Sequence, residues 1–147
     1  MRADTNTFHI LSFLLLRLSF SCIFLWFGLL KIFSISPVYD VILVAYPVIA
    51  QNYVLMFLLA LLEIAIGVGI LIPRISIMVL WVMIAHLLMA TIGVFHSSYA
   101  FTEGFPVLSF AGEFVVKNFA LISGALILIS HDTSMKKGLN LQEETAR

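Results

Sequence analysis

The chain has 147 residues, of which 62% are hydrophobic and 11% charged, and its formal net charge is zero. This composition is far more apolar than that of soluble globular domains, and it lacks the basic stripe that nucleic-acid binding needs. It therefore predicts an integral membrane protein with no nucleic-acid partner.

Four apolar runs are each long enough to cross a hydrocarbon core, which needs about 20 helical residues. In chain order they cover residues 10–33, 53–72, 75–95 and 107–130. The connecting segments are an outer loop near 34–52, a short link at Pro73–Arg74, an outer segment near 96–106, and a polar tail at 131–147. We predict one all-α domain over residues 1–147, an integral membrane four-helix bundle.

The distribution of Lys and Arg predicts the orientation of this bundle, because positively charged loops tend to stay cytoplasmic. One side collects Arg2, Arg74, Lys136, Lys137 and Arg147. The opposite side has Lys31 at its border and Asp40 and Glu103 in its loops. We therefore expect both termini to be cytoplasmic.

Ionisable residues inside membrane spans are rare and are functional candidates by default. The candidates for a ligand pocket between the helices are Arg17, Glu63, His86, Glu113 and Lys117. Lys31 and His96 are candidates at the outer border, where the long stem of Lys31 favours reaching toward the headgroups. A lone histidine on an apolar helix, such as His86, is more often a hydrogen-bonded core residue than a ligand.

Glu113 and Lys117 are four residues apart, so they share one helix face in the favourable order. Two explanations are equally open: the charges neutralise one another near the membrane surface, or they belong to a pocket. Either way, charges in hydrocarbon remain costly.

The depth of Arg17 in the membrane, counted in residues from the end of its apolar run, predicts its partner. At about 1.5 Å per residue, Arg17 lies about 10 Å from the cytoplasmic edge and Glu63 about 13 Å from it. These depths agree within one helical turn, so we expect Arg17 and Glu63 to pair. Lys117, about 20 Å in, would reach toward Glu63 from above.

Several kinds of redox and metal centre are excluded by the residue types present. With Cys22 as its one cysteine, the chain has no paired-thiol relay, no iron–sulfur ligation and no structural zinc. His86 has no histidine at matching depth to share a haem. We expect no metal and no intrinsic cofactor.

The chain resembles the DoxX family of small four-helix membrane proteins. The resemblance rests on Arg17 followed by "FGLLKIF", on "LLEIAIGVGILI", and on "FPVLSFAGEFVVKNFALISGALIL". It implies a four-helix bundle in the bacterial inner membrane. For some members it also implies a subunit beside a redox enzyme, such as thiosulfate:quinone oxidoreductase.

Two functions from different classes follow as expectations. In the first, the protein is a redox-associated subunit, not catalytic alone, whose polar pocket binds a quinone or another small lipophilic ligand, since apolar walls with a few polar groups suit such molecules. In the second, it is a non-catalytic scaffold or assembly protein; a small transporter is a third alternative. The expected partners are membrane lipids and either another protein or further copies of the chain.

Overall fold

The computed structural model describes residues 2–97, 99–102 and 104–145, without the side chains of residues 2–6, 139–140 and 143–145. Its helices are α1 (Arg2–Ile32), α2 (Tyr39–Ala45), α3 (Pro47–Gln51), α4 (Tyr53–Gly69), α5 (Ser76–His96), α6 (Phe110–Val116) and α7 (Asn118–Thr145). These described residues form no named strand, and the predicted all-α class is confirmed.

Three stretches of helix are long and apolar enough to span a membrane. They are Thr7–Ile32, Ser76–His96 and Phe110–Gly138, the last of which joins α6 and α7. The fourth apolar helix, α4, has 17 residues and is shorter. The four predicted runs therefore correspond to α1, α4, α5 and the α6–α7 stretch, which is compatible with a helical membrane bundle.

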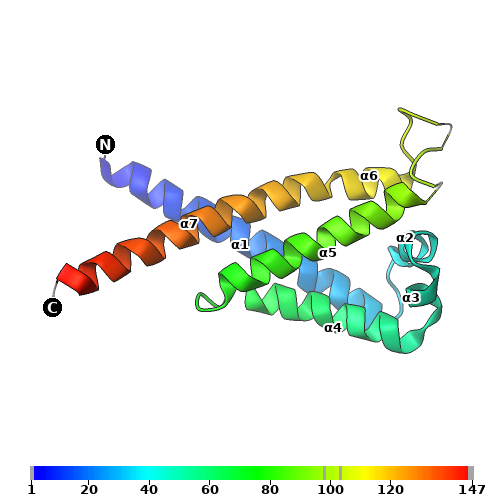
Figure 1. Cartoon of the computed structure of the whole chain (residues 1–147), viewed down its shortest axis with the longest axis horizontal. Coiled ribbons are helices and arrows are strands. Elements are labelled where there is room, and N and C mark those ends of the chain that lie inside the picture. The colour runs from blue at the N-terminus through cyan, green and yellow to red at the C-terminus, as the bar shows by residue number, and fades with distance from the viewer. Residues whose placement is uncertain (1, 98, 103, 146–147) are drawn as a thin grey trace.

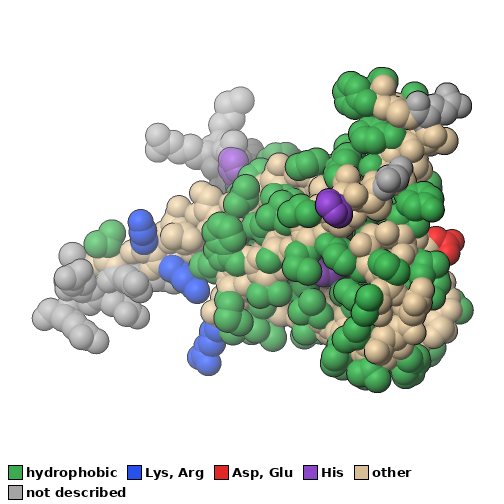
Figure 2. Space-filling model, turned by 45° about the vertical axis from the view of Figure 1, so that its right-hand side comes forward, with side chains coloured by type: hydrophobic (Ala, Val, Ile, Leu, Met, Phe, Trp, Pro, Cys, Tyr) green, Lys and Arg blue, Asp and Glu red, His purple; other side chains and the backbone are tan. Residues whose placement is uncertain are grey.

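Both termini and the turn between α4 and α5 lie at one end of the bundle, which we call the terminal end (Figure 1). The opposite loop end carries α2, α3 and the segment between α5 and α6 (Figure 1). The Lys and Arg side chains visible in Figure 2 gather toward the terminal end. Of the residues used to predict orientation, Glu103, Arg147 and the side chain of Arg2 lie outside the described part.

Hydrophobic side chains occupy both the inside and the outside of the bundle. The largest fully buried ones include Ile66, Ile70, Leu80, Met83 and Leu128. Much of the surface in Figure 2 is also hydrophobic. A surface and a core that are both apolar are what a lipid environment requires, because lipid tails are as apolar as the core.

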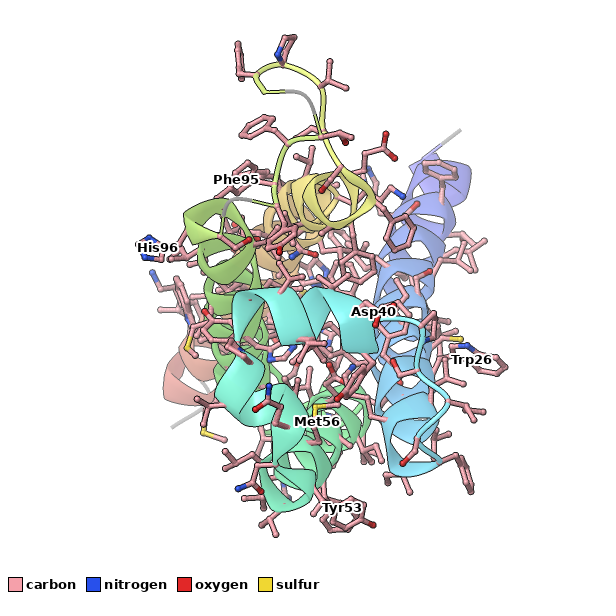
Figure 3. The ribbon with its side chains drawn as sticks, turned by 90° about the vertical axis from the view of Figure 1, so that its right-hand side faces the viewer. Trp26, Asp40, Tyr53, Met56, Phe95 and His96 are labelled. Carbon is pink, nitrogen blue, oxygen red and sulfur yellow. The ribbon has the colours of Figure 1, made fainter. Side chains whose placement is uncertain are left out.

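The segment that we predicted as an outer loop, residues 34–52, instead contains α2 and α3. Its apolar stretch "VILVAYPVIA" places Val41 and Ala50 in buried positions. Tyr46 separates the two helices, and Pro47 starts α3 at the position where a missing N–H costs nothing. The two helices lie across the loop end, between α1 and α5 (Figure 3).

Helices α1 and α4 pack closely because each presents a glycine to the other's backbone. A Cβ on Gly28 would lie 2.8 Å from the carbonyl oxygen of Ala60, and one on Gly67 would lie 3.0 Å from that of Ser21. These contacts fix how far α1 is shifted along α4. Lys31 lies one turn beyond Gly28 and Glu63 one turn before Gly67, so the contacts also bring these two side chains together.

Gly28→Ala is therefore expected to lower the free energy of unfolding by about 1–3 kcal/mol, the usual cost of overpacking a tight interface. Thermal unfolding in detergent measures this. Gly138→Ala is the matched control, because nothing lies within 4 Å of a Cβ there. The control should be neutral or stabilising, since alanine is the better helix former. Equal melting temperatures for the two variants would refute the close α1–α4 contact.

Candidate functional site

Lys31 and Glu63 form a buried ion pair between α1 and α4. The Lys31 ammonium donates to both carboxylate oxygens of Glu63, at 2.8 and 2.7 Å. The two side chains are only 2% and 6% exposed. Lys31 also lies 5.7 Å from the centre of the Phe27 ring, an attractive distance for a cation over an aromatic face.

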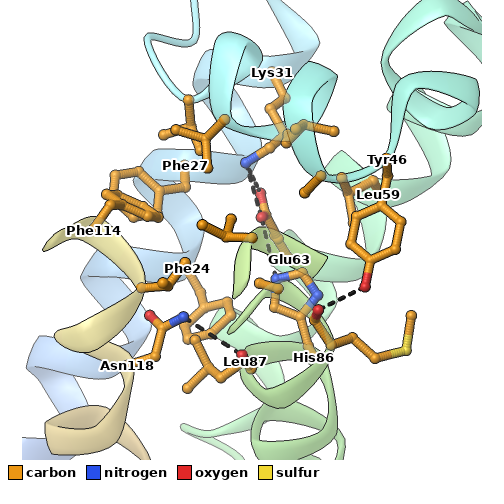
Figure 4. Close-up of a pocket in the computed structure, with 18 of the residues that line it drawn as sticks. Phe24, Phe27, Lys31, Tyr46, Leu59, Glu63, His86, Leu87, Phe114 and Asn118 are labelled. Atoms are coloured by element: carbon orange, nitrogen blue, oxygen red, sulfur yellow. Dashed lines mark hydrogen bonds and ion pairs between the residues drawn. The ribbon is translucent and has the colours of Figure 1, made fainter. Parts of the chain in front are cut away.

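His86 of α5 joins this pair, so that the three residues form what we call the Lys31–Glu63–His86 triad (Figure 4). Its Nε2 lies 3.5 Å from Glu63 Oε1, and its ring meets Phe24 edge to face. Its Nδ1 has no partner among the described residues. The triad thus joins an ammonium, a carboxylate and an imidazole from three different helices.

The triad lies in the wall of a cavity of about 130 Å³. All seven helices contribute to the lining, which is mostly aliphatic and aromatic. The polar residues of the lining are Lys31, Tyr46, Glu63, His86 and Asn118. A few polar groups in an apolar wall are the usual composition of a small-molecule site.

Tyr46 and Asn118 complete the lining from opposite sides (Figure 4). Tyr46 lies against Gly93, and its hydroxyl donates to the carbonyl oxygen of Met89 at 2.6 Å. Asn118, at the start of α7, donates to Thr91 Oγ1 at 3.1 Å. Tyr46 thereby fixes the α2–α3 segment on α5, and Asn118 fixes α7 on the same helix.

A second polar cluster lies toward the terminal end, around Arg17. Its guanidinium forms an ion pair with Asp132 of α7 and donates to Ser76 Oγ at 2.7 Å and to the carbonyl oxygen of Ile70 at 3.2 Å. Ser76 donates in turn to Asp132 Oδ2 at 3.2 Å. This Arg17–Asp132 cluster connects α1 to α7 and to the turn between α4 and α5.

The predicted pairing of Arg17 with Glu63 is wrong. The depth count treated Ile10 and Ile72 as level, but Gly67 packs against Ser21 and Gly28 against Ala60. The first turns of α1 therefore extend past α4. Arg17 consequently meets Ile70 and Asp132, and Glu63 is left for Lys31.

The expectations for Lys31 and for Glu113 with Lys117 also fail. Lys31 does not reach toward headgroups, since its side chain is 2% exposed and bound to Glu63. Glu113 and Lys117 are exposed, and neither belongs to an ion pair found in the described chain. Lys117 therefore does not extend the triad. His96 is exposed at the end of α5 and points away from the bundle (Figure 3).

Four polar residues of the cavity lining and the Arg17–Asp132 cluster were not identified as site residues from the sequence: Tyr46, Ser76, Asn118 and Asp132. Asp132 was assigned to the polar tail because the apolar run ends at Ser130, although α7 continues to Thr145. Tyr46 was assigned to a loop. Asn118 stands in the quoted "VKNF" as part of the DoxX resemblance and is not among the predicted site residues, although a polar amide inside a span was an available signal.

Comparisons of the chain with protein-family models, with curated proteins and with solved structures gave no significant match.

Proposed function

We propose that this protein is a membrane subunit that binds the ring of a quinone, or of a similar small lipophilic molecule, in the cavity beside the triad. The observation that carries the proposal is the buried Lys31–Glu63 ion pair with the half-buried His86 beside it, in the wall of a mostly apolar cavity. Charged groups are expensive to bury, and membrane proteins place them where they serve a ligand or a pathway.

The size of the cavity supports a single ring as the occupant. An apolar cavity of about 150 Å³ binds benzene, and this one is about 130 Å³. Phe24 and Phe27 supply aromatic wall, while the triad and Asn118 supply polar atoms for the ring's oxygens. Met89 lines the cavity and is 58% exposed, so an isoprenoid tail would leave the bundle beside it.

The proposed role beside a redox partner follows the DoxX resemblance. In this role the chain holds the ring, and a partner enzyme supplies or takes the electrons. We further propose that the protein lies in a bacterial inner membrane with both termini cytoplasmic. The exposed Arg74, Lys136 and Lys137 at the terminal end support that orientation.

Filling the cavity tests the proposal without removing a charge. Ala90 lines the cavity and Ala85, on the same helix, is exposed and does not. Ala90→Phe is expected to weaken binding of a short-tailed benzoquinone about tenfold or more, whereas Ala85→Phe should leave it unchanged. Equilibrium dialysis against protein in lipid nanodiscs measures both. Equal binding by the two variants would place the ligand elsewhere.

A scaffold is the second candidate function, and the hydrogen bonding favours it specifically. Among the described residues, every fully buried side-chain nitrogen or oxygen atom has a hydrogen-bond partner. Both polar clusters could thus serve only to hold the helices in register. Mass spectrometry of lipid extracts from the purified protein separates the two functions: a stoichiometric quinone supports the first, and an empty cavity beside a tightly bound protein supports the second.

A further inference from the structure

The Asn118 amide has one orientation, which is fixed by Thr91. The Thr91 hydroxyl donates its only proton to the carbonyl oxygen of Leu87, at 2.8 Å. Its oxygen can therefore only accept from Asn118. Because Asn118 faces two acceptors there, Thr91 Oγ1 at 3.1 Å and Leu87 O at 3.5 Å, its NH₂ group must point toward them.

The amide oxygen of Asn118 must then point the other way. No described residue donates to this Oδ1, although Asn118 is only 4% exposed. Every fully buried polar side-chain atom of the described residues has a hydrogen-bond partner. Because Oδ1 has none, it is not fully buried and must border open space. Asn118 is one of the residues that line the cavity, and we take Oδ1 to open onto it. A buried acceptor without a donor is costly, and a ligand that donates a hydrogen bond removes the cost.

The remaining polar atoms of the lining are also mainly acceptors. The ionised Glu63 carboxylate only accepts, and Lys31 spends two of its three N–H groups on it. Tyr46 gives its proton to Met89 O. His86 Nε2 lies 3.5 Å from Glu63 Oε1. The cavity thus offers acceptors at Asn118 and Glu63, against one uncommitted N–H on Lys31.

We infer that the cavity prefers the reduced form of its ring ligand, a hydroquinone, over the oxidised quinone. A hydroquinone carries two O–H donors that match Asn118 Oδ1 and an acceptor of the triad. A quinone carries only accepting oxygens, which leave Asn118 Oδ1 without a donor. The inference rests on the proposed function, because it concerns the ligand of the same cavity.

The test compares both redox forms of one short-tailed benzoquinone under anaerobic conditions. The full chain in nanodiscs should bind the hydroquinone about tenfold more tightly, the effect of about one additional buried hydrogen bond. Equal affinities, or tighter binding of the quinone, would overturn the redox preference and leave the proposed ring site standing. Binding of neither form would overturn both.

A matched pair of variants tests the role of Asn118 without altering the lining. Thr91 does not line the cavity. Thr91→Val removes the acceptor that orients the Asn118 amide, so the preference for hydroquinone should fall toward a ratio of about one. Thr91→Ser keeps the hydroxyl and should keep the ratio. An unchanged ratio in Thr91→Val would show that the Asn118 orientation does not set the preference.

Discussion

Replacing either Lys31 or Glu63 by leucine is expected to lower the free energy of unfolding by about 3–5 kcal/mol. Each single change leaves the opposite charge buried without its partner, in side chains that are 2% and 6% exposed. The double variant should cost clearly less than the sum of the two, because it strands no charge. Denaturation of the four proteins of this cycle in mixed micelles provides the measurement.

Glu113→Leu and Lys117→Leu supply the control for the cycle. Both residues are exposed and outside the ion pairs of the described chain, so each change should stay within about 0.5 kcal/mol. Strict additivity of the Lys31 and Glu63 variants, or single effects as small as those of the controls, would contradict a buried pair.

The helices could be predicted from the sequence because long apolar runs leave few alternatives in a membrane. The run 75–95 became Ser76–His96, and 53–72 became the shorter Tyr53–Gly69. The segment 34–52 was misassigned because its apolar stretches are too short to span. Its helices α2 and α3 depend on packing over the cavity, which the local sequence does not show.

The site could be predicted only in part. Glu63 and His86 were identified as buried ionisable residues, and the structure brings them together. Their contact with Lys31 could not be derived from the sequence. The length of an apolar run shows that the helix can span the membrane, but it does not show how far the helix is shifted along its neighbour. That height is set by individual contacts, such as Gly28 against Ala60.

The triad and the Arg17–Asp132 cluster lie toward opposite ends of the bundle. The triad lies beside the cavity toward the loop end, whereas the Arg17–Asp132 cluster lies toward the terminal end and lines no part of that cavity. Residues of α1 belong to both clusters. Damage to the second cluster should therefore affect stability without altering the cavity.

Arg17→Leu is accordingly expected to cost about 3 kcal/mol of unfolding free energy, the lower end of the range for breaking a buried ion pair. The lower end applies because the Arg17 and Asp132 side chains are still 19% and 10% exposed. The change removes the donor to Ile70 O and leaves the Asp132 carboxylate with Ser76 and His131. The same mixed-micelle denaturation measures the loss.

Ser76→Ala provides the graded comparison, because it removes one hydroxyl from the cluster and keeps the ion pair. Its cost should be nearer 1 kcal/mol, that of a single hydrogen bond. Below their melting temperatures, Arg17→Leu and Ser76→Ala should bind the benzoquinone ring like the unmodified chain, because neither residue lines the cavity. An Arg17 effect no larger than that of Ser76 would show that Asp132 does not depend on its guanidinium. Lost ring binding in a folded Arg17 variant would show that the two clusters are coupled through α1.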